Sequence, residues 1–196
     1  MKKATLRQQE IVDCARKIIS TQGIENLTIR KIANVLNVTD GALYRHFKSK
    51  REIISLLIDD IEKTLFNTIG LATQEANDPI TKLTNIFLSH ISYAEQRKGV
   101  SFIIINETLS LKDKSLQRRM FRVIHRYIKK IKHILENGVK IGRFRKKIDL
   151  NASSIVFFGM AQSIVTLWSL SGFKYSLNRS RLYEMLNIYV KGIAYN

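Results

Sequence analysis

The chain has 196 residues, with 33 Lys and Arg against 16 Asp and Glu, which gives a formal net charge of +17. Its hydrophobic content of 45% is enough for a buried core, so the composition excludes a disordered chain. The single cysteine excludes an internal disulfide framework and fits a reducing compartment such as the cytoplasm. One proline and nine glycines are too few for the many turns of a β-sandwich or β-barrel. We therefore expect an all-α fold.

Positive charge is concentrated in two blocks of the chain. Residues 1–51 hold 11 basic and 4 acidic residues, residues 112–147 hold 14 and 2, and the remainder is nearly neutral. An excess of this size favours polyanionic partners, of which double-stranded DNA is the first candidate. For the second block a solvated helix face is the simpler interpretation, and a second DNA or lipid surface is the alternative.

The segment from Leu150 to Phe173 is long enough to cross a bilayer, because it contains 24 consecutive residues without a charge. Eight of these residues are polar, which is more than is usual in a membrane-spanning helix. We therefore expect a helix buried in protein and no membrane partner. The basic N-terminal segment leads into no apolar run, so no signal peptide is expected.

The first helix is predicted to begin after Thr5, whose hydroxyl can form a capping box with Gln8. Gly23 is predicted to end this helix, because glycine tolerates the left-handed backbone that follows many helix C-termini. The apolar residues between these two signals recur at helical spacing and are Ile11, Ala15, Ile18 and Ile19.

Two short helices are predicted next, each preceded by a threonine. Thr28 and Thr39 can accept hydrogen bonds from the free N–H groups of a first helical turn. The third helix directs Leu43 and Phe47 inward and leaves a polar, aromatic outer face. Two such helices joined by about three residues are typical of a helix-turn-helix unit. The apolar face of the second helix consists of Ile29, Ile32, Ala33 and Leu36.

The chain resembles the DNA-binding domain of TetR-family transcriptional regulators over the segments TIRKIA (28–33), NVT (37–39) and ALYRHFKSK (42–50). The resemblance implies a cytoplasmic bacterial homodimer of about nine helices per chain that binds a palindromic operator and usually represses transcription. It also implies a DNA-binding domain at residues 1–50, followed by a helical effector-binding and dimerisation domain at residues 51–196.

The same resemblance implies DNA contacts for individual residues. In the family the position of Thr28 binds phosphate, that of Arg30 often contacts a base, and that of Lys50 contacts phosphate. The residues that begin the third helix meet base edges. The complete predicted set is Thr28, Arg30, Thr39, Asp40, Gly41, Ala42, Tyr44, Arg45, His46, Lys48 and Lys50.

Three members of this set have alternative interpretations. Tyr44 matches a contact to the DNA backbone but could instead only pack on Phe47. His46 matches a backbone contact too, with a half-buried structural residue as the alternative. Asp40 is unusual because a carboxylate repels phosphate; we interpret it as a helix cap, with cytosine N4 as the alternative partner.

Six more helices are predicted after the helix-turn-helix unit. Ser49 caps the first of them and forms a capping box with Glu52, and Asp78 caps the next at Pro79. Gly138 is predicted to close the long basic helix. The predicted ranges are 50–73, 79–97, 102–109, 115–137, 150–171 and 179–193.

The resemblance implies that the last two helices pair with those of a second chain. This arrangement would explain why the helix at 150–171 is apolar on nearly all sides. The predicted interface residues are Phe158, Gln162, Leu182, Leu186, Tyr189 and Val190.

A ligand cavity is predicted among helices four to eight. The apolar run Ile103–Ile105 suggests an apolar effector, which would move the dimer off its operator by favouring another conformation. The candidate contacts could equally be ordinary core or surface residues; they are His90, Tyr93, Phe102, Asn106, His125 and Trp168.

Other functions find less support in the sequence. The four histidines have no metal-ligand spacing, and the chain has no glycine-rich phosphate loop or nucleophile motif, so no enzyme, metal or cofactor is expected. The alternative function is that of a TetR-fold nucleoid-associated protein of the nucleoid occlusion type, which binds many chromosomal sites. Residues 42–69 and the run Phe173-Lys174-Tyr175 suggest it.

Overall fold

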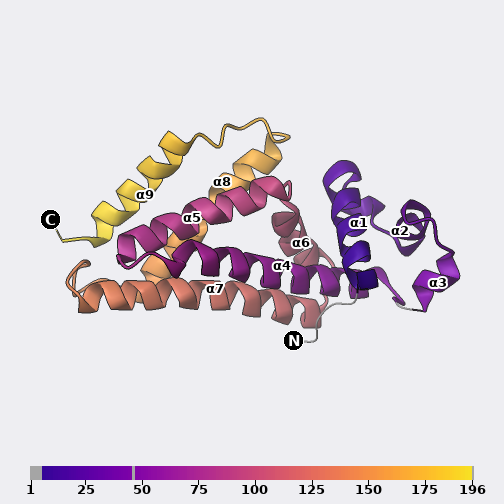
Figure 1. Ribbon diagram of the computed structural model, residues 1–196, viewed down its shortest axis with the longest axis horizontal. Coiled ribbons are helices and arrows are strands. Elements are labelled where there is room, and N and C mark those ends of the chain that lie inside the picture. The colour runs from indigo at the N-terminus through magenta and orange to yellow at the C-terminus, as the bar shows by residue number, and fades with distance from the viewer. Residues whose placement is uncertain (1–5, 46, 196) are drawn as a thin grey trace. The chain divides into compact units, whose positions relative to one another are not determined.

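The structure is a computed structural model that describes residues 6–45 and 47–195 (Figure 1). Over these residues it contains nine α-helices and one short 3₁₀ helix, so the predicted all-α fold is confirmed. The elements are α1 Leu6–Gln22, η1 Ile24–Asn26, α2 Ile29–Val35, α3 Asp40–Tyr44, α4 Lys50–Gln74, α5 Pro79–Gln96, α6 Val100–Ser110, α7 Lys114–Lys140, α8 Leu150–Leu170 and α9 Arg179–Ile193.

The chain divides into two compact units. The first unit contains the described residues up to Lys63 together with Arg97–Met120, and the second contains Thr64–Gln96 and the described residues from Phe121 onward. The first unit therefore includes α1, α2, α3 and α6, and the second includes α5, α8 and α9.

In the first unit α2 contacts both α1 and α3 (Figure 1), and these helices share a small apolar core. Gly23 ends α1 with a φ of 89°, so its predicted role is confirmed. The side chains that close this core are fully or almost fully buried, and they include Ile11, Ala15, Ile18, Leu27, Ile32, Leu43 and Phe47. Apart from Leu27, which follows η1, these are apolar positions that the helical spacing selects, because each faces its neighbours once per turn.

The second unit packs α5, α8 and α9 against one another (Figure 1). Phe157 of α8 lies at its centre, with its ring centroid 5.9 Å from Phe87 of α5 and 5.5 Å from Tyr189 of α9. α8 is long and apolar enough to cross a membrane by length and composition alone. Its contacts with α5 and α9 bury one side of the helix, whereas large apolar side chains on its other side remain exposed in the single chain, so the expected protein-buried helix stays a prediction.

The end of α7 differs from the prediction. The helix continues through Gly138 to Lys140, and the left-handed glycine that follows it is Gly142, with a φ of 77°. Gly138 is needed for a different reason, because a Cβ at this position would collide with the ring of Phe144. Phe144 is completely buried, so the ring cannot move outward into solvent.

Candidate nucleic-acid interface

Both helices of the predicted helix-turn-helix unit are capped by their threonines. The Thr28 hydroxyl accepts a hydrogen bond from the Lys31 N–H at 3.0 Å, and the Thr39 hydroxyl accepts one from the Ala42 N–H at 3.2 Å. Each cap satisfies a backbone donor that the first helical turn leaves unpaired. The caps therefore fix the start of α2 and of α3, which is where a helix-turn-helix unit meets DNA.

The outer surface of α2 and α3 is formed by predicted DNA-binding residues. Tyr44 is 52% exposed, so its ring does not simply pack into the protein. Asp40 and Ala42 are half-buried, and His46 lies outside the described residues. The exposed members of the set are Thr28, Arg30, Thr39, Gly41, Tyr44, Arg45 and Lys48.

The beginning of α3 corrects the interpretation of Asp40. Thr39 caps the helix, and Asp40 is the first helical residue, where a carboxylate interacts favourably with the helix dipole. At Gly41 a Cβ would meet no atom within 4 Å, and the backbone does not require glycine. The fold itself therefore does not explain the glycine, and the missing side chain leaves the surface of α3 open at this point.

Lys50 differs from the other predicted phosphate ligands because its side chain is already engaged. Its Nζ donates to the Ile24 carbonyl at 2.9 Å and lies 2.9 Å from Oε1 of Glu107. The side chain therefore joins the start of α4 to η1 and α6, all in the first unit. Sequence reasoning missed this link, because nothing in the local pattern relates Lys50 to Glu107.

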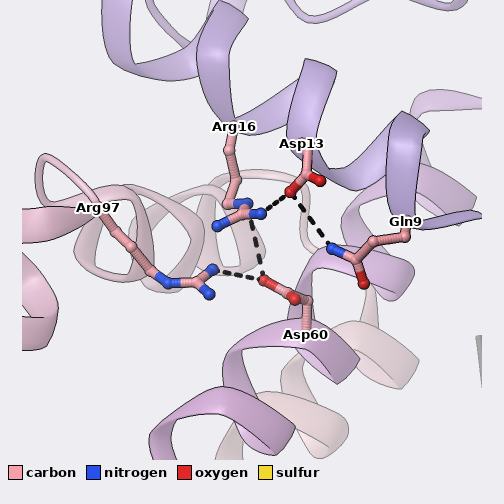
Figure 2. Close-up of polar contacts among 5 residues, drawn as sticks. All are labelled: Gln9, Asp13, Arg16, Asp60 and Arg97. Carbon is pink, nitrogen blue, oxygen red and sulfur yellow. Dashed lines mark hydrogen bonds and ion pairs between the residues drawn. The ribbon is translucent and has the colours of Figure 1, made fainter.

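A cluster of polar and charged side chains joins α1 to α4 (Figure 2). Asp60 of α4 accepts a hydrogen bond from Arg97 at 2.6 Å and lies 3.8 Å from Nε of Arg16 in α1. Arg16 also pairs with Asp13, which accepts from Gln9 at 3.3 Å (Figure 2). Asp60 and Arg97 keep less than a fifth of their side-chain surface exposed, so this pair is less screened by water than a surface ion pair.

The predicted effector residues His90 and Tyr93 are buried in the second unit. His90 Nδ1 lies 3.2 Å from the Tyr127 hydroxyl, and burial lowers the pKa of His90 to about 4 despite a hydrogen bond with Gln162. Burial also raises the pKa of Tyr127. Both groups are therefore neutral at pH 7 and form a polar contact inside an apolar core.

The other four predicted effector residues have different environments. In the first unit Phe102 is half-buried, and exposed Asn106 donates to its carbonyl at 3.0 Å. In the second unit His125 is exposed and stacks on Phe121 with 5.7 Å between ring centroids, whereas Trp168 is buried beside Phe173. These residues therefore lie in different environments, and a shared ligand cavity stays a prediction.

The predicted dimer residues point largely into the chain's own core. Leu182, Leu186 and Tyr189 are each at most 6% exposed, and the Tyr189 hydroxyl donates to the Ser153 carbonyl at 3.0 Å. Phe158 packs edge-on against Tyr127, Gln162 bonds His90, and Val190 is half-buried. These inward contacts leave a different surface for a second chain. The large apolar side chains exposed on α8 and α9 are Ile155, Val156, Leu167, Leu170, Tyr183 and Ile188.

Two further observations concern ligand chemistry. In the described part of the chain no three His, Cys, Asp or Glu residues are grouped so that they could hold a metal ion. Cys14 is buried in α1, and burial raises the pKa of its thiol. A thiol in this environment is a poor nucleophile, because reactivity requires the thiolate.

The two capped helices and their exposed polar face define a helix-turn-helix DNA-binding protein. Family models confirm this class and extend it to the rest of the chain. Residues 11–57 match the model described as bacterial regulatory proteins of the tetR family, and residues 58–190 match the C-terminal region of YsiA-like proteins. The chain belongs to the TetR family of bacterial transcriptional regulators, which is a non-enzymatic family.

The similar proteins include a nucleoid occlusion factor and two transcriptional regulators of known structure. The nucleoid occlusion factor SlmA of Photorhabdus laumondii is 30% identical over 159 residues, which is 80% of either chain. The transcriptional regulator FadR from Bacillus subtilis, solved in complex with stearoyl-CoA, is 23% identical with a TM-score of 0.74 over 93% of this chain and 95% of its own. The ketosteroid transcriptional regulator KstR2 of Mycobacterium tuberculosis is 20% identical with a TM-score of 0.76, and the match covers 99% of this chain and 98% of KstR2. The two structures establish a shared fold.

Proposed function

We propose that this protein is a homodimeric repressor that binds a palindromic operator in the cytoplasm and is released by a small apolar ligand. The observation that carries the proposal is a helix-turn-helix unit with an exposed face around Tyr44, joined to a region that matches YsiA-like proteins over residues 58–190. A dimer suits this unit, because paired recognition helices bind half-sites about one DNA turn apart.

The dimer proposal rests on the exposed apolar side chains of α8 and α9. Leu170 is 78% exposed and Ile188 is 64% exposed, which is unusual for side chains of this size on folded helices. A second copy that covers these helices would remove this surface from water and so stabilise the pair. The prediction of an α8–α9 interface is therefore kept, with these outward residues in place of the buried ones.

The effector proposal draws on the relatives. FadR was solved with stearoyl-CoA, and KstR2 is a ketosteroid regulator, so both names point to ligands that are largely apolar. We assign this chain an effector with a long apolar portion. Adding stearoyl-CoA as a probe to the protein–operator complex should release the DNA, whereas free coenzyme A should not. No release by stearoyl-CoA at micromolar concentration would count against an acyl thioester.

Selection of duplexes from a random library tests the DNA-binding role directly. A palindromic consensus is expected, and Tyr44→Ala should weaken its binding by about 1–3 kcal/mol. Gly41→Ala should also weaken binding while the fold is kept, because the added Cβ meets no protein atom. Tyr195→Ala is the matched control, since Tyr195 is 53% exposed but lies far along the chain. If Tyr44→Ala, Gly41→Ala and wild type bound the consensus duplex with equal affinity, α3 would not be part of the DNA-binding surface.

A second candidate function is supported by the identity of 30% with a nucleoid occlusion factor. Such a protein would occupy many dispersed chromosomal sites. A genome-wide map of the bound protein separates the two functions. One or a few palindromes in promoters support the local repressor, whereas many dispersed sites without adjacent regulated genes support the chromosome-organising function.

A further inference from the structure

The second half of α7 and the turn after it form the most basic surface of the second unit. Residues 121–147 contain ten lysines and arginines and a single carboxylate, Glu136. We call the cations from Arg122 to Lys147 the α7 basic face. Its exposed members are Arg122, Arg126, Lys129, Lys140, Arg143, Arg145, Lys146 and Lys147.

Seven of the ten cations of this face make no ion pair with a carboxylate among the described residues, unlike several cations of the first unit. There, Lys50 pairs with Glu107, Arg51 with Asp113 and Arg119 with Asp59. On the α7 basic face Arg143 pairs with Asp78, and the Arg145 guanidinium donates to the Gly192 carbonyl. Among the described residues no carboxylate pairs with Arg122, Lys129, Lys130, Lys132, Lys140, Lys146 or Lys147. Most of the charge of this face is therefore not neutralised by ion pairs among the described residues.

Four of the exposed cations form a row along one side of the helix. Arg122, Arg126, Lys129 and Lys140 recur at helical spacing, and the 18 residue steps from the first to the last span about 27 Å at 1.5 Å per step. Arg126 is held in place over the ring of Phe66, 4.2 Å from its centroid. A row of this length offers several separate contacts to a polymer whose charges are regularly spaced.

A groove beside this row provides room for an anionic group. It has a volume of about 350 Å³, and its polar lining includes His125, Lys129, Lys132, His133, Glu136 and Asn151. Two lysines and an amide that line one hollow can donate hydrogen bonds to phosphate oxygens.

The opposite side of α7 argues against a lipid surface as the partner. Val123, Tyr127, Ile131 and Leu135 are each at most 4% exposed in the protein core, so this apolar side is not free to enter a bilayer. A helix that lies on a membrane needs a free apolar side as well as a basic one. Phe121 is the one large exposed apolar residue of α7 and stacks on His125. Binding by charge alone is what a DNA backbone requires.

We propose that the α7 basic face binds the phosphate backbone of DNA without sequence preference, as a second DNA surface separate from the helix-turn-helix unit. This surface does not depend on the repressor function, since it would act on any duplex. It would raise the affinity for DNA that flanks a specific site, or join a second duplex to the bound protein.

A triple variant of the full-length protein tests this surface. Arg122→Gln, Lys129→Gln and Lys140→Gln remove three exposed cations whose side chains make no ion pair in the described structure. We measure its affinity for a 30-base-pair duplex of mixed sequence by fluorescence anisotropy over a range of salt concentrations. At low salt we expect the affinity to weaken about tenfold. The magnitude of the slope of log affinity against log salt should decrease by about 2.7 for each protein chain that contacts the duplex.

A matched variant controls for the change in net charge. Lys63→Gln, Lys98→Gln and Lys174→Gln remove three exposed lysines from other surfaces and should leave affinity and slope within twofold of wild type. Thermal melting by circular dichroism establishes that both variants fold. The proposal is overturned when the two triple variants bind the mixed duplex equally.

The specific site and a lipid surface are tested in parallel. Tyr44→Ala should reduce the preference for the selected operator but keep the salt-dependent binding that the α7 basic face provides, so failure of this proposal is distinct from failure of the repressor function. Vesicles of phosphatidylglycerol test the alternative surface. Vesicle binding that is lost in the α7 triple variant while duplex binding stays intact would overturn the DNA proposal in favour of lipid.

Discussion

Lys50 and Glu107 form an ion pair with 2.9 Å between Nζ and Oε1, and the same ammonium group donates to the carbonyl of Ile24. One side chain thus connects α4, α6 and the 3₁₀ turn that precedes α2. Glu107 keeps only 13% of its side-chain surface exposed, so water screens this pair less than a surface pair. The arrangement suggests a positioning role for Lys50, and the phosphate contact that the family resemblance implies stays a prediction.

A double-mutant cycle tests this positioning role. We expect Lys50→Met and Glu107→Gln each to weaken operator binding, with the double variant little worse than either and a coupling free energy of about 1 kcal/mol. The reason is that both changes break the same ion pair between α4 and α6. A Lys50 that only binds phosphate would give a loss with Lys50→Met and none with Glu107→Gln. Anisotropy titrations of the four proteins decide between these results.

The outward residues of α8 and α9 predict the consequences of adding charge. Ile188→Glu and Val156→Glu should give folded monomers, because an unpaired carboxylate would be buried between two chains. Leu186→Glu should instead unfold the protein, since Leu186 is only 3% exposed within its own chain. Sedimentation velocity reports the monomer, and circular dichroism reports the fold.

The control for this pair of variants is Leu71→Glu. Leu71 is 73% exposed on α4, so its substitution changes charge without touching α8 or α9. This variant should remain a dimer. A dimeric Ile188→Glu protein, or a monomeric Leu71→Glu protein, would place the interface on another surface.

The buried histidine predicts a loss of stability in acid. The pKa of His90 falls from 6.5 to about 4 on folding, so the unfolded chain binds more protons between these two values. Stability is therefore complete above pH 6.5 and declines as the pH falls toward 4. At pH 5 the loss attributable to His90 should be about 2 kcal/mol relative to pH 7.5.

Urea unfolding at pH 7.5 and pH 5 measures this effect. His90→Phe should lower stability at pH 7.5, because the Tyr127 hydroxyl loses a partner, but it should reduce the difference between the two pH values by about 2 kcal/mol. His125→Gln, at an exposed position, should leave the difference unchanged. If the free energy of unfolding changed equally between pH 7.5 and pH 5 in His90→Phe and in wild type, His90 would not be buried in the neutral form.

The close approach of Phe144 to Gly138 predicts opposite effects for two glycine substitutions. Gly138→Ala should destabilise the protein by about 1–3 kcal/mol, since the new methyl group would displace a buried ring. Gly70→Ala should stabilise it by about 0.5–1 kcal/mol, because this residue lies inside α4 and its new methyl group would meet no atom within 4 Å. Chemical denaturation of both variants gives the change in the free energy of unfolding for each. A Gly138→Ala protein more stable than wild type would contradict the packing argument.

The fold class and many helix boundaries were predictable because local interactions determine them. Thr28, Thr39, Asp78 and Asp149 each accept hydrogen bonds from N–H groups at most three residues away. Helical spacing also selected the buried residues of the helix-turn-helix unit. Because a cap and its helix lie within one turn of the chain, the sequence alone was enough to place these helices and to suggest the family.

Tertiary structure decided the features that depend on residues far apart in the chain. α8 is apolar on nearly all sides, so its sequence could not tell which residues face the core and which remain exposed. On α9 the predicted interface residues Leu182, Leu186 and Tyr189 are buried within their own chain. The role of Gly138 depends on Phe144, whose ring returns to α7 only after the turn at Gly142. Lys50 acquires its partner from α6. Local sequence specifies hydrogen bonds within a turn, whereas packing between helices selects the face that each helix buries and the partners that its charges find.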